Sequence, residues 1–287
     1  GSMARDYMPD DVIGFNANTY AYYASQCNGL AYNPNAAYSR PVDSTGAALP
    51  AGSFTFPSPA SLSSQRTISS AAPTIATGTL TVTVGGSFGS YSSGNIVTLY
   101  SDDDVNKLMV GTVTGWNGTT RALTLTVTAV QGSGILTNPR MGSGDNRAFY
   151  FTYSGSSPAL GYTYNSSGVI TTTNFYRDCN TTIGSAPASG AVFTKAFVTP
   201  ASSATELENY RNWYTYYRTR ILMAKSATSL AFRGIGDRFR VGFTTISSKD
   251  VSGSNFLDAA DFDAAQKSSF YTNLNGASPS SSTPLRG

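Results

Sequence analysis

The chain has 287 residues, of which 12% are charged, and its formal net charge is +3. This length can form one substantial hydrophobic core or two smaller ones. A net charge this small, without a cluster of Lys and Arg, argues against a nucleic-acid partner. The sequence contains no histidine, which excludes His-ligated zinc and catalytic triads that use histidine as the base. No apolar run reaches the length of about 18 residues that a membrane span requires, and no signal peptide is visible.

Residues 1–65 are predicted to form an irregular, Tyr-rich N-terminal arm followed by a linker. The tyrosines of the arm are separated by Pro and Asn and show little periodicity, so we expect their rings to pack on the main domain. Residues 41–64 are rich in Pro, Ser and Ala, which is typical of a loop or linker. The tyrosines between positions 4 and 40 are Tyr7, Tyr20, Tyr22, Tyr23, Tyr32 and Tyr38.

Residues 66–137 are predicted to form an inserted antiparallel β-module. Apolar residues alternate with threonine over 79–84 and over 123–128, which indicates strands with one buried face. A further strand is expected at 96–100. The pair Asn117-Gly118 favours a two-residue hairpin turn with positive φ at both positions. Together these segments predict a meander or barrel of four or five strands.

Residues 138–200 are predicted to be a β-rich segment with strands at 147–153 and 192–198. In the last part, 201–287, apolar residues and tyrosines recur at steps of three and four from Leu207 to Ala231, which predicts one long aromatic helix. Glycines then precede a hydrophobic run at 240–246, which is typical of a strand of a parallel sheet covered on both faces. A second helix is expected from Asp261 to Leu274.

Four segments of the chain have unusually specific sequences. They are Asn28-Gly-Leu-Ala-Tyr-Asn-Pro34 followed by Tyr38, NWYTYYRTRILMAKSA (212–227) with RFRVGFTTI (238–246), Asp261-Phe-Asp-Ala-Ala-Gln-Lys267, and Thr283-Pro-Leu-Arg286. These segments resemble the type IV pilus tip adhesins of the PilC/PilY family, within their von Willebrand factor A-like module. The resemblance extends over about half of the chain, mostly at its two ends, and it does not include residues 66–200.

This resemblance implies an α/β fold with a partial von Willebrand A-like, Rossmann-like core that carries the long helix and the β-insert. It implies an exported protein at the pilus tip or cell surface that attaches to a host or abiotic surface, including a glycan, and that acts in pilus biogenesis or retraction. Minor pilins would be its partners at the tip. A different hypothesis is a carbohydrate-binding module that acts through the β-insert. In a third, the insert is only a spacer.

The chain has two cysteines, Cys27 and Cys179. An even number in an exported protein favours a disulfide, whereas a reducing compartment would leave two free thiols. The family's metal site would use Ser2, if Gly1-Ser2-Met3 is native and not a tag, and Thr283. Two hydroxyls without a carboxylate bind Mg²⁺ poorly. We therefore expect no cofactor in this chain and Mg²⁺ or Ca²⁺ only in the full-length protein.

Exposed aromatic residues of the insert are the candidate ligand-facing groups, namely Trp116, Tyr91 and Tyr100, with packing inside the module as the alternative. The run 102–104 of three aspartates suits either a calcium loop or a solvated turn, and its spacing favours the turn.

A carboxylate-only glycosidase is chemically possible. Its acidic groups would be Glu206 with Glu208, or Asp258, Asp261 and Asp263. Both sets are better explained by helix starts, where carboxylates complement the helix dipole. The glycines at 85, 86 and 89 precede no helix, so a dinucleotide site is not expected. We predict that the chain is not an enzyme.

Overall fold

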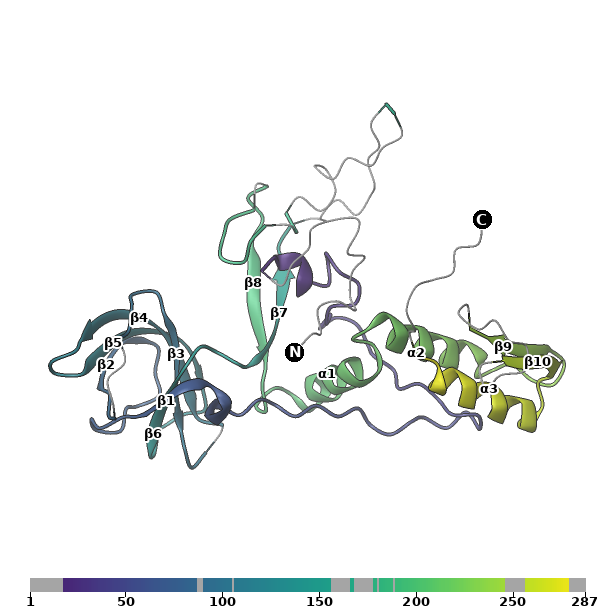
Figure 1. Ribbon diagram of the computed structural model, residues 1–287, viewed down its shortest axis with the longest axis horizontal. Coiled ribbons are helices and arrows are strands. Elements are labelled where there is room, and N and C mark those ends of the chain that lie inside the picture. The colour runs from purple at the N-terminus through teal and green to yellow at the C-terminus, as the bar shows by residue number, and fades with distance from the viewer. Residues whose placement is uncertain are drawn as a thin grey trace. The chain divides into compact units, whose positions relative to one another are not determined.

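The computed structural model describes residues 18–86, 90–104, 106–155, 166–167, 178–179, 181–187, 189–245 and 256–278. The chain divides into two compact units, which we name the barrel unit and the scaffold unit (Figure 1). The barrel unit comprises Thr55–Ala148 and Phe197–Ser203. The scaffold unit comprises Gly1–Phe54, Phe149–Ala196 and Ala204–Gly287. The chain therefore enters the barrel unit twice.

The barrel unit is built on a six-stranded sheet in the order β1-β6-β3-β4-β5-β2. Every pairing in this order is antiparallel. An isolated antiparallel bridge joins Ile68 to Val84, and the Ser69 amide donates to the Thr83 carbonyl oxygen over 2.8 Å. These contacts join the two end strands at one end, where they close the sheet into a barrel. The elements are η2 (Pro59–Ser61), β1 (Ser63–Thr67), β2 (Gly78–Thr83), β3 (Ile96–Ser101), β4 (Leu108–Asn117), β5 (Ala122–Gln131) and β6 (Pro139–Ser143).

The interior of the barrel is filled by alternate residues of its strands. On β3, Val97 and Leu99 are buried in the interior, whereas Tyr100 belongs to a second cluster with Leu108 and Val110. This alternation follows from the strand period of two, and it confirms the strands predicted at 79–84, 96–100 and 123–128. The interior core consists of Ile68, Val82, Val84, Val97, Leu99, Met109, Val113, Leu123, Leu125, Val127, Leu136 and Met141.

The β4–β5 hairpin has a longer turn than predicted. Neither Asn117 nor Gly118 has a positive φ, and the left-handed position is Arg121, with φ 57°. The Asn117 Oδ1 atom accepts hydrogen bonds from the amides of Thr119 and Thr120 over 3.0 and 3.1 Å. A side chain that bonds its own following backbone stabilises a turn without the two left-handed residues of the shorter hairpin. The predicted two-residue turn is therefore wrong, although the hairpin itself is confirmed.

The scaffold unit contains the described α-helices and most of two short sheets. Strands β7 and β8 form one two-stranded sheet and confirm the strands predicted at 147–153 and 192–198, whereas β9 and β10 form the other. The elements are η1 (Tyr20–Tyr22), β7 (Ala148–Tyr153), β8 (Phe193–Val198), α1 (Ala204–Tyr216), α2 (Arg220–Phe232), β9 (Arg240–Thr244), β10 (Phe256–Asp261) and α3 (Ala264–Gly276).

The long aromatic helix predicted up to Ala231 is wrong, because the chain forms two helices at this place. Thr219 is extended, and its side chain accepts a hydrogen bond from the Leu222 amide, which starts α2 as an N-cap. The Ser226 hydroxyl of α2 donates to the carbonyl oxygen of Tyr216 over 2.7 Å. This bond satisfies a terminal carbonyl of α1 that a break in the helix would otherwise leave without a partner.

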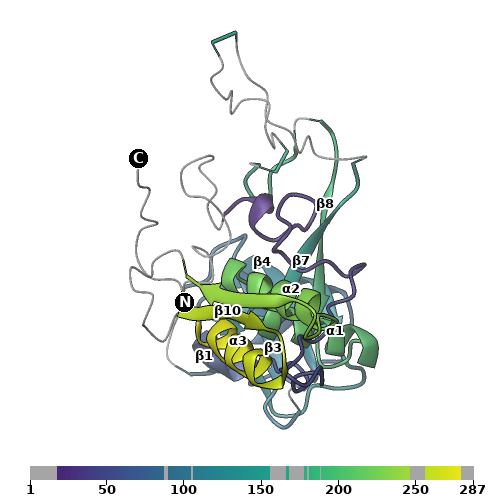
Figure 2. The ribbon, with the colours of Figure 1, turned by 90° about the vertical axis from the view of Figure 1, so that its right-hand side faces the viewer.

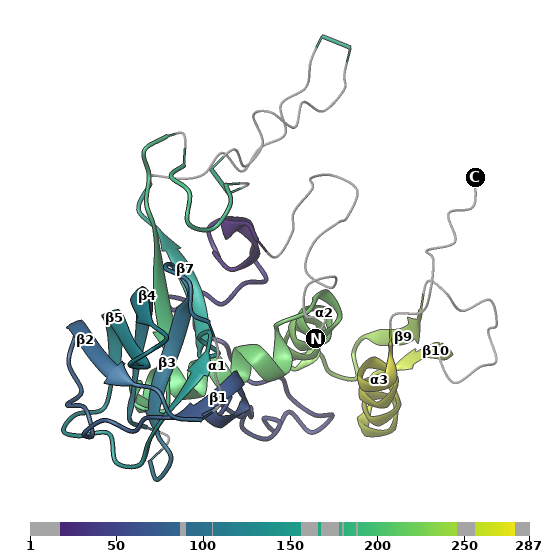
Figure 3. The same cartoon turned by 60° about the vertical axis from the view of Figure 1, so that its left-hand side comes forward.

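The strand predicted at 240–246 is not part of a parallel sheet. Its described part, β9, pairs antiparallel with β10, and its residues alternate between exposed and half-buried. Figures 2 and 3 show the β9–β10 pair beside α3, where Val241 and Phe243 pack with Phe270. A Cβ atom on Gly242 would lie 2.8 Å from the Leu257 carbonyl oxygen. Glycine is therefore required here by the close approach of the partner strand.

The expected α/β class, with a partial Rossmann-like core, is therefore wrong. The described part of the chain is mostly β, and it contains no strand–helix–strand crossover between parallel strands. The second helix is confirmed as α3. It starts at Ala264 and not at Asp261, because Asp258 and Asp261 belong to β10. Its N-cap is Asp263, whose Oδ1 atom accepts from the Gln266 amide over 2.9 Å.

Candidate functional site

Two of the three aromatic residues predicted to face a ligand lie at the surface of the barrel unit. Tyr91 and Trp116 are half-buried, and their rings meet edge to face with centroids 4.9 Å apart. Tyr100 is different, because it is only 2% exposed and its hydroxyl donates to the Gln65 Oε1 atom. Tyr100 therefore packs inside the unit and presents no surface to a ligand.

Tyr91 lines a hollow of about 310 Å³ on the barrel unit, which we name the Arg66 hollow. Its walls come from β1, β3, β6 and the loop before β3. That loop is held by Asn95, whose Oδ1 atom accepts from the Ser92 amide over 3.0 Å. The residues that line the Arg66 hollow are Ser64, Arg66, Ser90, Tyr91, Asn95, Ile96, Val97 and Ser143.

Arg66 is the charged residue of this hollow, and no carboxylate among the described residues neutralises it. Its Nη1 atom donates to the Gln65 carbonyl oxygen over 2.7 Å, and no described residue forms an ion pair with it. The Nε atom is buried and has no hydrogen-bond partner within the described ranges. Burial raises the pKa of the Tyr91 hydroxyl above its ordinary value, and the positive charge of Arg66 acts against that rise. In the part of the hollow that the structure describes, a guanidinium without a carboxylate partner thus lies among neutral polar groups.

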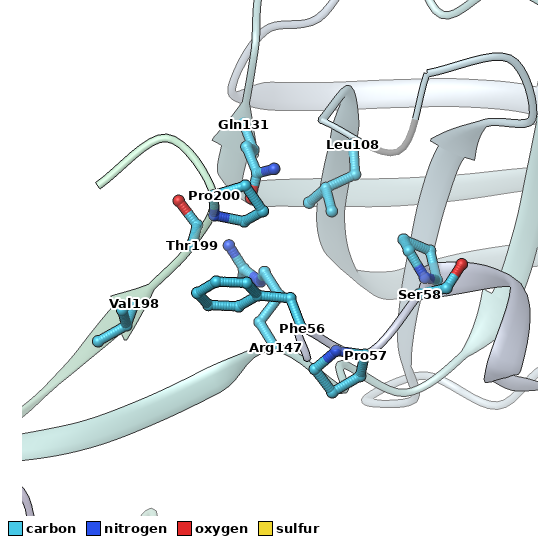
Figure 4. A pocket seen from close by; sticks show the side chains of 10 residues that line it. Phe56, Pro57, Ser58, Leu108, Gln131, Arg147, Val198, Thr199 and Pro200 are labelled. Atoms are coloured by element: carbon cyan, nitrogen blue, oxygen red, sulfur yellow. The ribbon is translucent and has the colours of Figure 1, made fainter. Parts of the chain in front are cut away.

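A second pocket of the barrel unit is smaller and apolar (Figure 4). Its volume of about 90 Å³ is close to that of three water molecules in the liquid, which is too small for a sugar ring. Its guanidinium, from Arg147, is fixed by two hydrogen bonds of 2.9 and 2.8 Å to Asp145 and lies 3.7 Å from the ring centre of Phe197. The lining residues are Phe56, Pro57, Ser58, Pro59, Leu108, Gln131, Arg147, Val198, Thr199 and Pro200.

This second pocket lies where the two segments of the barrel unit meet, since its lining comes from both Thr55–Ala148 and Phe197–Ser203. The Arg147 guanidinium has its charge neutralised and its face covered. We therefore assign this pocket to the packing of the unit and not to ligand binding.

Each of the aspartates at 102–104 forms an ion pair or a hydrogen bond with another group of the protein. Asp102 pairs with Arg140 over 2.8 Å, and Asp103 accepts from the Asn138 side-chain amide over 2.9 and 2.7 Å. The Asp104 Oδ1 atom accepts from the Asn106 amide over 3.0 Å. These bonds describe a solvated turn.

Other acidic groups do not assemble into a metal site in the described part of the chain, where no three His, Cys, Asp or Glu residues could hold an ion together. Glu206 and Glu208 lie in the first turns of α1. The predicted metal ligands Ser2 and Thr283 lie outside the described residues.

Two of the resembling segments, the one that starts at Asn28 and the one that starts at Asn212, meet in the scaffold unit. The Tyr32 ring contacts Tyr210 and Trp213 of α1, at centroid distances of 4.9 and 5.6 Å. The Asn209 side chain accepts from the Tyr38 amide over 2.8 Å and donates to the Ala36 carbonyl oxygen over 2.6 Å. These contacts attach the N-terminal arm to the helix, so the resembling residues are explained by packing.

Cys27 and Cys179 are joined by a disulfide in the scaffold unit, with Cα atoms 5.8 Å apart. Both are buried, at 4% and 0% exposure. Next to them, Asp178 is buried and accepts hydrogen bonds from the hydroxyls of Tyr153 and Ser189. A disulfide of this kind fits an exported protein.

The residues that the sequence did not single out are Arg66 and its polar neighbours in the hollow. They come from positions far apart in the chain, at 64–66, 90–95 and 143. The available signal was the lone Arg66 among the Ser, Thr and Gln residues of β1. That pattern indicates an exposed strand and does not indicate a ligand-binding site.

Two similar proteins from the comparison of sequences are type IV pilus biogenesis factors. One is PilY1 of Pseudomonas aeruginosa strain PAK, which is 33% identical over 93 residues, corresponding to 30% of this chain and 8% of that protein. The other is PilY1 of strain PAO1, which is 31% identical over 107 residues, corresponding to 33% of this chain and 9% of that protein. The chain thus matches less than a tenth of the length of these relatives.

No protein-family description matches the chain, and neither does any solved structure. The similarity therefore supports a general relationship to type IV pilus proteins but does not extend to a von Willebrand A-like module. Among the described helices, none is long and apolar enough to cross a membrane.

Proposed function

We propose that this chain is a non-enzymatic, extracellular adhesion module of a type IV pilus-associated protein. In this proposal the protein acts at the pilus tip, where it attaches to a host or abiotic surface and takes part in pilus biogenesis or retraction with the minor pilins. The similarity to PilY1 supports the relationship to pili. The buried disulfide supports export, because such bonds persist in oxidising compartments.

The observation that carries the proposal is the closed barrel, with its own core, placed between segments of a disulfide-bonded scaffold unit. Closure of the end strands shortens the free strand edge, so the barrel can be displayed on a surface with less tendency to pair with other strands. We therefore place attachment in the barrel unit and the connection to the rest of the pilus protein in the scaffold unit.

A competition experiment tests this proposal. The purified 287-residue chain is added to piliated bacteria that make the full-length protein, and attached cells are counted on epithelial cells and on glass. We expect the chain to reduce attachment in proportion to its concentration. The same chain unfolded throughout before it is added, as checked by circular dichroism, is the control. Unchanged attachment at saturating concentrations of the folded chain would contradict the proposal.

The second candidate is a carbohydrate-binding module that acts through the barrel unit. The observation that favours it is the Arg66 hollow, which is lined by serine, asparagine and tyrosine side chains. A glycan array separates the two, because a signal on glycans that is lost in Trp116→Ala or Tyr91→Ala would favour the carbohydrate-binding module.

A further inference from the structure

We propose that the Arg66 hollow binds a sugar that carries a carboxylate, such as a uronic acid or a sialic acid at the end of a glycan. This inference rests on the proposed adhesion function, for which it names the ligand class. It is argued from the charge, the size and the lining of the hollow.

The first argument is the free charge of Arg66. Two other arginines of the barrel unit are neutralised by carboxylates, Arg140 by Asp102 and Arg147 by Asp145, each over 2.8 Å. Arg66 has no such partner among the described residues, and its buried Nε atom is left without an acceptor. A guanidinium presents donors in a planar fork that matches the two oxygens of a carboxylate. The Nε atom itself is buried, so a ligand carboxylate would pair with the accessible part of the guanidinium and neutralise its charge.

The second argument is the size of the hollow. Its volume of about 310 Å³ lies at the lower end of the range of small-molecule sites, which suits one sugar ring with its substituents. Its walls are β-strands and residues 90–95, where the Ser92 amide bonds to Asn95, so these lining groups are held in place before a ligand arrives.

The third argument is the neutral part of the lining. Hydroxyls of Ser64, Ser90 and Ser143 surround the hollow, and each can donate and accept a hydrogen bond. Asn95 uses its Oδ1 atom within the loop, while its Nδ2 atom bonds to no group in the part that the structure describes. An acidic peptide side chain would use Arg66 alone, whereas a sugar acid has hydroxyls for the whole lining. The sugar is therefore the better match.

The fourth argument is the apolar side of the hollow. The Tyr91 ring is supported by the edge of Trp116, and Ile96 is 50% exposed at the same place. An aromatic ring and an aliphatic side chain offer contact area to the C–H face of a sugar, as the apolar walls of ligand sites do. Tyr91 would thus contact the C–H face of the sugar, and Arg66 would bind its carboxylate.

The test is calorimetric titration of the 287-residue chain with D-glucuronate and with N-acetylneuraminate. D-Glucose serves as the neutral probe for the first. We expect saturable binding of at least one acid and binding of glucose weaker by about tenfold or more, because a charged hydrogen bond is lost. Arg66→Gln should weaken the binding of the acid by about tenfold or more. Arg140→Gln, a matched change at an arginine that Asp102 neutralises, should leave it unchanged.

Two further variants test the roles of Arg66 and Tyr91 separately. Arg66→Lys keeps the charge but loses the planar fork, so we expect an affinity between those of the native chain and Arg66→Gln. Tyr91→Leu keeps an apolar contact for Trp116 and should weaken binding by several-fold. Thermal unfolding of each variant shows whether it is folded. No heat with either acid, or equal binding of glucose, would overturn the proposal.

Binding of an Asp-rich peptide that depends on Arg66, without binding of either sugar acid, would also overturn it. The titration is independent of cell attachment, so the two proposals fail separately. Sugar binding without competition by the chain would refute adhesion and keep the site. Competition that Arg66→Gln does not alter would keep adhesion and refute the site.

Discussion

The indole nitrogen of Trp213 donates a hydrogen bond to the carbonyl oxygen of Leu30, 183 residues earlier in the chain, over 2.9 Å. Both residues are buried in the scaffold unit. Next to this bond, the Asn212 side chain donates to the Tyr38 carbonyl oxygen over 3.1 Å and accepts from the Gly52 amide over 3.0 Å. Several backbone groups of the irregular N-terminal arm are thus satisfied by side chains of α1.

This relationship predicts the effect of Trp213→Phe. The substitution keeps an aromatic ring but leaves the buried Leu30 carbonyl without its donor, so we expect a loss of about 1–3 kcal/mol in unfolding free energy. Urea unfolding followed by circular dichroism measures it. Trp116→Phe is the matched control, because no described residue bonds its indole nitrogen, and it should lose less. Equal losses for the two variants would contradict the importance of the Leu30 bond.

The disulfide should make a large contribution to the stability of the scaffold unit. Cys27 and Cys179 are separated by 152 positions, for which the chain-entropy account gives about 5 kcal/mol. If the barrel unit stays folded while the scaffold unit unfolds, the loop that the disulfide closes is shorter. The closure entropy depends on the logarithm of loop length, so this correction is less than about 1 kcal/mol. We expect the Cys27→Ser, Cys179→Ser variant to unfold at lower urea concentration.

Alkylation followed by mass spectrometry checks that the native chain has no free thiol before reduction and two afterwards. If the double variant unfolded at the same urea concentration as the native chain, the disulfide would not be a stabilising element of the scaffold unit.

The buried tyrosines of the scaffold unit predict loss of stability at alkaline pH. Burial is the main cause that raises the pKa of Tyr32 to about 12, and burial also raises that of Tyr210. The folded state then keeps protons that the unfolded state releases above its ordinary value of about 10. Stability is therefore fully present below about pH 10 and is lost as the pH rises toward 12. With no histidine in the chain, we expect little change between about pH 6 and 8.

Urea unfolding at a series of pH values, together with tyrosine absorbance at alkaline pH, measures this dependence. Tyr32→Phe should make the alkaline loss smaller, because it removes one of the raised groups. A stability that stays constant from pH 7 to about pH 11.5 would be inconsistent with the burial of these rings.

The β4–β5 turn predicts that one substitution stabilises the barrel unit. Arg121 has a left-handed backbone, with φ 57°, which costs an ordinary side chain roughly 1 kcal/mol relative to glycine. Arg121→Gly should therefore raise the unfolding free energy by up to about 1 kcal/mol, and Arg121→Val should lower it. Thermal unfolding of both variants gives the sign, and a more stable valine variant would show that the turn has another backbone.

Period-two patterns predicted the barrel strands well, because the side chains of Leu123, Leu125 and Val127 lie in the core and those of the intervening residues lie on the other face of the strand. The helix α3 was also readable, although its start was predicted at Asp261, three residues before Ala264. These features depend on neighbours in the sequence. The barrel's closure was not readable, because the bridge between Ile68 and Val84 depends on how the end strands meet.

The α/β fold was predicted wrongly for two physical reasons. The spacing from Leu207 to Ala231 is helical throughout, and nothing in it shows that Thr219 and Ser226 together stabilise a break. Likewise, Val241 and Phe243 suit a parallel or an antiparallel strand equally well, and only the partner β10 decides. The Arg66 hollow could not be predicted from the sequence either, because its groups come together only in the folded barrel.

Excision of the barrel strands tests the central claim, that attachment belongs to the barrel unit, most directly. Ser63 and Ser143 are partners in the β1–β6 register and therefore lie about 5 Å apart, so a linker of about four Gly and Ser residues can replace residues 63–143. The measurement is attachment per surface pilus in bacteria that make the full-length protein with this excision. We predict that pili are still assembled and that attachment falls strongly. Unchanged attachment per pilus would contradict the account and leave the barrel as a spacer.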